Sequence, residues 1–162
     1  MADERAPVLV LGVGNELFRD EGLGVVAARC VAQLDLAGVE VADGGTLGLS
    51  LLPEIADREA VLILDAVVKH DGRPGEVVVL ADGSVPTGWT HVVSAHQIGV
   101  PDALAAAALA GRAPRRVAVV GMVPASLDTG FGLTPETAAH IDELVRRTLG
   151  VLSGWGIEAC GA

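Results

Sequence analysis

The sequence is poor in aromatic residues and in cysteine, with two Phe, two Trp, two Cys and no Tyr among 162 residues. Its hydrophobic fraction of 51% must therefore come mainly from Val, Leu, Ile and Ala, in the balance of a globular chain. Cys30 and Cys160 lie far apart and form no CxxC or Cys/His pattern, which excludes a zinc finger and a disulfide framework. We expect one domain, residues 1–162, long enough to bury its own core.

Positive charge is also scarce, because 11 Lys and Arg face 21 Asp and Glu, a formal net charge of −10. Such an excess of acid repels phosphate backbones and anionic lipids, so we expect neither nucleic acid nor a membrane as a partner. The apolar run Val8–Val13 is too short for a signal peptide or a membrane span, which predicts a cytoplasmic protein. The sequence leaves the oligomeric state open and is compatible with a monomer.

Short runs of Val, Leu and Ile bounded by glycine alternate with longer segments of helical periodicity. This order predicts a three-layer α/β fold, in which a mostly parallel, twisted sheet of about five strands carries helices on both faces. The expected strands are Val8–Val13, Val39–Ala42, Val61–Leu64, Glu76–Leu80 and Val117–Val120. The expected helices are Asp20–Asp35, Leu49–Asp57, a segment within Gln97–Leu109, and Pro135–Leu152 with Thr134 as its N-cap.

Polar segments follow several of these strands, where open parallel sheets bind their ligands. They are Gly12-Val13-Gly14-Asn15 leading to Asp20-Glu21-Gly22, then Asp43-Gly44-Gly45-Thr46, Asp65-Ala66 and Ser94-Ala95-His96-Gln97. The glycines also have a purely structural explanation as turn residues. The acids and the histidine of these segments are therefore the candidates for chemistry.

Each candidate also has a structural explanation of its own. Glu21 in a first helical turn is favoured by the helix dipole, and Asp65 after an apolar strand is typical of a hydrogen-bonded loop acid. Ser94 and Gln97 have the spacing of a capping box, which predicts His96 in a first helical turn, where the dipole keeps imidazole neutral and able to bind metal. Two carboxylates and one imidazole suit nickel, zinc or a similar ion and leave positions open for water or substrate.

Two other kinds of site have less support. Gly12 and Gly14 follow a strand, with Asp43 where a ribose-binding acid would stand, but the dinucleotide motif requires glycine where this chain has Leu17. A serine or cysteine nucleophile is disfavoured, because Cys30 faces the core by periodicity and no G-x-S-x-G sequence is present.

Taken in order, these segments resemble the maturation endopeptidases of nickel-iron hydrogenases. The resemblance covers nearly the whole chain and includes Gly121-Met122-Val123-Pro124 and Gly132-Leu133-Thr134-Pro135. It implies an enzyme that removes a short C-terminal peptide from the precursor of a hydrogenase large subunit after nickel has been inserted. A non-catalytic module that binds nickel and the precursor is the alternative function.

The resemblance also implies roles for individual residues. By motif match, Glu21, Asp65 and His96 bind the metal, and Asp43 in the DGGT segment lies near them. The metal is expected to be nickel carried by the substrate, for which zinc or another divalent ion can substitute. We expect Asp43 and Asp65 to take part in catalysis, with Asp43 as the general base if the metal does not itself activate the water.

Overall fold

A computed structural model describes residues 5–81, 92–94 and 99–159. Its main sheet has the strand order β2-β1-β3-β6-β4, and β5 pairs with β3 away from this path. Strands β1, β2, β3 and β6 are parallel, whereas β4 is antiparallel to β6 and β5 is antiparallel to the end of β3. The bounds are β1 Val8–Val13, β2 Val39–Gly45, β3 Ala60–Lys69, β4 Val77–Ala81, β5 Val92–Ser94 and β6 Arg116–Met122. The expected mostly parallel α/β fold is confirmed.

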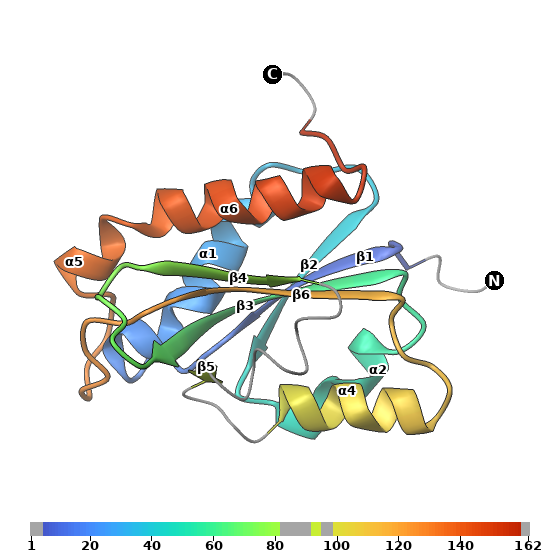
Figure 1. Ribbon diagram of the computed structural model, residues 1–162, viewed down its shortest axis with the longest axis horizontal. Helices are drawn as coiled ribbons and strands as arrows, with labels where there is room; N and C mark the ends of the chain where they lie inside the picture. Colours follow the sequence, from blue (N-terminus) through green and yellow to red (C-terminus); the bar gives the residue numbers. More distant parts are fainter. Residues whose placement is uncertain (1–4, 82–91, 95–98, 160–162) are drawn as a thin grey trace.

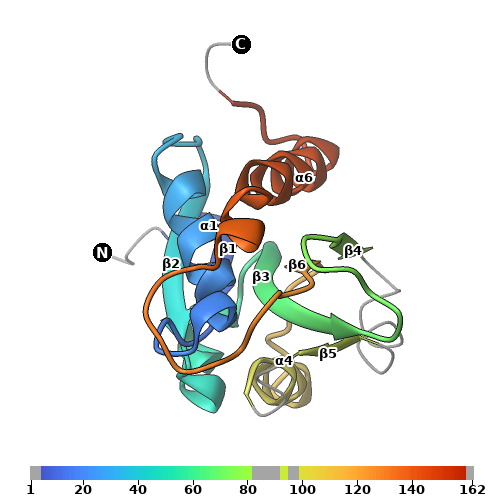
Figure 2. The same ribbon diagram turned by 90° about the vertical axis from the view of Figure 1, so that its left-hand side faces the viewer.

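Helices cover both faces of this sheet. Their bounds are η1 Arg19–Gly22, α1 Leu23–Ala32, η2 Gly48–Leu51, α2 Leu52–Ile55, α4 Val100–Leu109, α5 Pro135–Ala138 and α6 Ile141–Gly154. Helices α1 and α6 lie on one face and α2 and α4 on the other, which gives the three layers (Figures 1 and 2). Among the described helices, none is long and apolar enough to cross a membrane.

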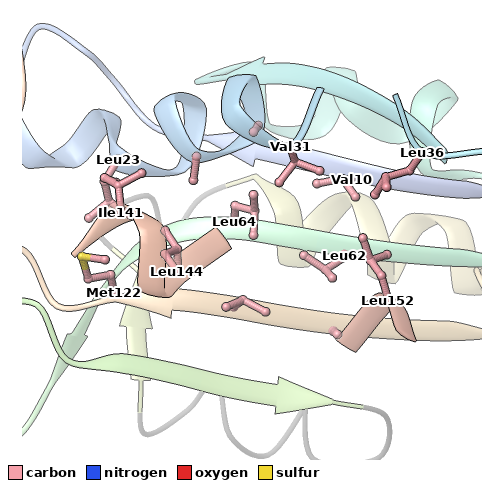
Figure 3. Close-up of a cluster of buried hydrophobic side chains, with 14 of the residues drawn as sticks. Val10, Leu23, Val31, Leu36, Leu62, Leu64, Met122, Ile141, Leu144 and Leu152 are labelled. Atoms are coloured by element: carbon pink, nitrogen blue, oxygen red, sulfur yellow. The ribbon is translucent and has the colours of Figure 1, made fainter. Parts of the chain in front are cut away.

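Two hydrophobic clusters, one on each face, make up most of the core. Leu62 and Leu64 of β3 point toward α1 and α6, where they pack with Leu23 and Leu144 (Figure 3). Ile63 belongs to the cluster beneath α2 and α4, because successive residues of a strand face opposite sides. Strands buried on both faces need continuous apolar runs, which is the pattern that the sequence shows.

The expected first and last helices are both interrupted. The first comprises the 3-10 turn η1 and then α1, which ends at Ala32, three residues before Asp35 adopts a left-handed backbone with φ of 47°. The last comprises α5, then a break, then α6. Thr134 caps α5 as predicted, since its side chain accepts a hydrogen bond from the Thr137 amide at 3.3 Å.

One expectation near the site was wrong, and another falls on residues that are not described. The strand that contains Asp65 does not end there, because β5 pairs with Val67–Lys69 and extends β3 beyond the acid. Ser94 is the last residue of β5, and the rest of the predicted capping box, which includes His96 and Gln97, lies outside the described residues, so this cap stays a prediction. The next described helix, α4, begins at Val100 after Gly99. Pro101 fits the first turn of α4, where its missing N–H breaks no helical hydrogen bond.

Candidate active site

The carboxyl ends of three parallel strands meet at one edge of the sheet. Gly12 of β1 is in register with Asp43 of β2 on one side and with Leu64 of β3 on the other. Asp43 and Leu64 are therefore two strand spacings, about 10 Å, apart. Asp65 is the next residue of β3, so Asp43 and Asp65 stand at two separate positions along this edge.

Close backbone packing brings the turn that carries Glu21 onto the same edge. A Cβ on Gly24 would collide with the carbonyl oxygens of Leu64 and Val13, and a Cβ on Gly14 would collide with the carbonyl oxygen of Glu21. Because glycine has no side chain at these positions, η1 and the start of α1 rest directly on the strand ends, and η1 contacts β3.

The two acids of the predicted metal site differ in exposure. Asp65 is only 2% exposed, whereas Glu21 is half-buried in η1. The third predicted ligand, His96, lies outside the described residues. Among the residues that are described, no three His, Cys, Asp or Glu side chains are grouped closely enough to hold a metal ion. The set of Glu21, Asp65 and His96 stays a prediction.

Asp43 lies at an open cavity of about 470 Å³, within the range of about 300–1,000 Å³ that is typical of small-molecule sites. Its Oδ1 accepts a hydrogen bond from the Gly45 amide at 3.0 Å, and its side chain is 52% exposed. Gly14, Asn15, Glu16, Leu17, Val25, Gly45, Thr46 and Phe131 complete the lining. The carboxylate is thus held in place while it remains accessible to water and to a ligand.

Asp20, directly before Glu21, was given no role in the metal site or in catalysis by the sequence, and its side chain is completely buried. Its carboxylate accepts five hydrogen bonds, which come from the amides of Ala125, Ser126 and Thr134 and from the hydroxyls of Thr134 and Thr137. Burial raises the pKa of Asp20, but the hydrogen bonds from Thr134, Thr137 and Ser126 outweigh it, so that the pKa lies below its ordinary value. Asp20 thereby ties the turn of Glu21 to the loop before α5.

Arg29 on α1 is a second residue that the sequence did not single out. It donates to both carboxylate oxygens of Glu16, at 2.6 and 2.8 Å, and reaches Oδ2 of Asp43 at 3.4 Å. The hydrogen bonds and negative charge of Glu16, followed by the charge of Asp43, raise the pKa of Arg29. Both acids that line the cavity are therefore paired with one guanidinium.

No local signal in the sequence identifies these two residues. Asp20 has the position of an ordinary helix-start acid, and its partners lie over a hundred residues further along the chain. Arg29 has the position of an exposed helix cation. Their roles come from tertiary contacts, which spacing within one segment does not reveal.

Comparison with known proteins gives matches along almost the whole chain. The HycI family, described as hydrogenase maturation protease, matches residues 25–151. The Hydrogenase 2 maturation protease of Escherichia coli (strain K12) is 39% identical over 154 residues, which are 94% of each chain. The hydrogenase expression/formation protein HupD of Rhodobacter capsulatus is 40% identical over 155 residues, covering 93% of this chain and 73% of HupD.

Solved structures agree with these sequence matches. The hydrogenase maturating endopeptidase HybD from E. coli superposes with a TM-score of 0.84 at 38% identity, covering 93% of this chain and 94% of HybD. The [NiFe] hydrogenase maturation protease HybD from Thermococcus kodakarensis gives 0.76 at 29% identity, covering 89% of this chain and 97% of that one. The similarity therefore extends over the layers and the edge described above.

Proposed function

The chain belongs to the hydrogenase maturation protease family, and from this premise we propose that it removes the C-terminal extension of a nickel-iron hydrogenase large-subunit precursor after nickel insertion. It is an endopeptidase of the hydrogenase maturation type. The observation that carries the proposal is the carboxylate of Asp43, which is fixed and water-accessible at the wall of an open cavity.

We assign Asp43 the role of general base. It takes a proton from a water molecule, whose oxygen bonds to the carbonyl carbon of the scissile peptide. When the C–N bond breaks, the proton held by Asp43 passes to the leaving nitrogen. The hydrogen bond from the Gly45 amide supports this role, because it fixes Oδ1 of a side chain that lines the cavity and is half-exposed, while Arg29 approaches Oδ2 at 3.4 Å.

Glu21, Asp65 and His96 are proposed to recognise nickel that the precursor already carries. Two carboxylates and an imidazole match the ligand preference of nickel and do not fill its coordination sphere. The contact of η1 with β3, and the packing of Gly24 on the carbonyl oxygen of Leu64, support the pairing of Glu21 with Asp65. The same three side chains would bind zinc or another divalent ion in the precursor. Asp65 would act in catalysis by holding the substrate's metal near the peptide bond that is cut.

The test is the mass of a hydrogenase large-subunit precursor after incubation with this protein, measured with and without nickel in the precursor. We expect loss of the C-terminal peptide from the nickel-loaded form only. Asp43→Asn should lower the cleavage rate about 100-fold or more, the usual contribution of a general base. Asp65→Asn and Glu21→Gln should weaken the preference for the nickel-loaded form.

Asp142→Asn, an exposed acid on α6, is the matched control and should cleave like the wild type. An unchanged precursor mass with nickel-dependent binding of the precursor would indicate a non-catalytic module instead. Full activity of Asp43→Asn would exclude Asp43 as the base, and equal cleavage of nickel-free precursor would exclude nickel recognition.

A further inference from the structure

Arg29, Glu16 and Asp43 form an ion-pair cluster that joins three segments of the chain. Arg29 lies on α1, Glu16 lies in the turn after β1, and Asp43 lies in β2. The two N–H groups of the Arg29 guanidinium hold Glu16 in a bidentate pair at 2.6 and 2.8 Å. Such a pair fixes direction as well as distance, because the planar guanidinium matches the two carboxylate oxygens.

The cluster borders both parts of the candidate site. Glu16 and Asp43 line the cavity, and Arg29 approaches Asp43 at 3.4 Å. Glu16 is also packed on η1, since a Cβ on Gly22 would come within 2.8 Å of its Cγ. Gly22 directly follows Glu21, so the same glutamate contacts the turn of the predicted metal ligand and the cation that reaches Asp43.

We propose that Arg29 is a positioning residue for the reaction, which together with Glu16 sets the carboxylate of Asp43 at the cavity wall. Its effect on cleavage rests on the proposed function, whereas its effect on geometry does not. Without Arg29, the carboxylates of Glu16 and Asp43 would line the cavity with no guanidinium between them. Their mutual repulsion would push Asp43 out of the orientation that the hydrogen bond from Gly45 supports. Lysine would restore the charge but not the bidentate contact.

The experiment compares Arg29→Ala with Arg112→Ala. Both arginine side chains are 55% exposed and paired with an acid, but Arg112 pairs with Asp57 at the opposite edge of the sheet. Amide hydrogen exchange at Gly45 reports on the Asp43 contact directly. We expect exchange about two- to fivefold faster in Arg29→Ala, the range that an exposed ion pair supports, and no change in Arg112→Ala. Arg29→Lys should give an intermediate rate.

Cleavage of the precursor is the second readout. The kcat of Arg29→Ala should fall about two- to fivefold with little change in KM, and added salt should lower the wild-type kcat toward that of the variant, because screening weakens exposed pairs. Equal Gly45 exchange in the two alanine variants would overturn the proposal, as would faster exchange with unchanged kcat. If the wild type cleaves no precursor while Gly45 exchange still responds to Arg29→Ala, the proposed function fails and the positioning of Asp43 stands.

Discussion

Asp20 shows how a single buried charge organises this protein. A buried carboxylate is costly unless its oxygens are hydrogen-bonded, and here three amides and two hydroxyls supply those bonds. All five donors belong to residues 125–137, so the contact closes a loop between the start and the end of the chain. Glu21 follows directly, and its turn is therefore held by a contact that involves no active-site chemistry.

Asp20→Asn should show how far the stability of the protein depends on the charge of Asp20, because the effect of the substitution changes with pH. At pH 7 we expect a loss of about 2–4 kcal/mol in the free energy of unfolding, because a buried charged acceptor is removed while its donors remain. The pKa of Asp20 is lowered in the folded state, so its stabilising contribution is complete above its unfolded value of about 3.9 and is lost as the pH falls through the folded pKa. The stabilities of variant and wild type should therefore begin to converge as the pH falls below about 4, and meet only below the folded pKa of Asp20.

Urea unfolding followed by circular dichroism at several pH values measures this difference. Asp128→Asn, an exposed acid in the same loop, serves as the control and should track the wild type throughout. A difference between Asp20→Asn and wild type that is independent of pH would show that the charge of Asp20 is not what stabilises the loop.

At the scale of elements, the glycine at the start of α1 determines how closely the helix approaches the sheet. Gly24→Ala places a methyl group against the carbonyl oxygens of Leu64 and Val13, so α1 must shift. We expect a loss of at least about 2 kcal/mol in unfolding free energy, and a displaced η1 that lowers cleavage of the precursor. Gly150→Ala is the matched control, because it lies inside α6 with nothing within 4 Å and should gain about 0.5–1 kcal/mol. Thermal unfolding of the two variants should thus shift in opposite directions.

The elements also show which parts of the fold can be predicted from the sequence. β1 was predicted with its observed bounds, and the predicted helix Pro135–Leu152 contains α6, in which Ile141, Leu144 and Leu152 are buried at helical spacing. Such elements are specified by a period within one segment, which sequence reasoning can detect. β5 was missed because its pairing with Val67–Lys69 is a contact between distant segments, and three residues are too few to show a period.

The residues of the candidate site also fall into those that the sequence singled out and those that it missed. Asp43 was singled out because it follows a predicted strand, and it lies within β2 at the wall of the cavity. Arg29 and Glu16 were missed because each is an ordinary exposed charge until α1 packs against the turn after β1. Sequence reasoning therefore singled out acids at the carboxyl edge of the parallel strands and missed the charged residues that contact Asp43.

On the scale of the whole molecule, the two edges of the sheet have different chemistry. At the amino edge, arginine side chains connect separate segments of the chain. Arg58 is buried and donates to the Ala6 carbonyl and to Glu40, both at 2.7 Å. Arg112 pairs with Asp57. The carboxyl edge carries glycines and the acids Asp43 and Asp65. Open α/β sheets bind ligands at the carboxyl edge, so the amino edge is available for contacts that serve stability alone.

This division predicts opposite effects for Arg58→Met and Asp43→Asn. Arg58→Met keeps an apolar stem but loses contacts that join the segment before β1 to β2 and α2, and should lower the unfolding free energy by about 2–3 kcal/mol. Its kcat per folded molecule should equal that of the wild type at temperatures well below its melting point.

Asp43→Asn should retain the wild-type free energy of unfolding within about 0.5 kcal/mol, because the Asp43 side chain is exposed, yet it should lose cleavage. Urea unfolding and precursor cleavage measured on the same preparations separate the two effects, and a fall in kcat for folded Arg58→Met would show that the edges are coupled through the strands between them.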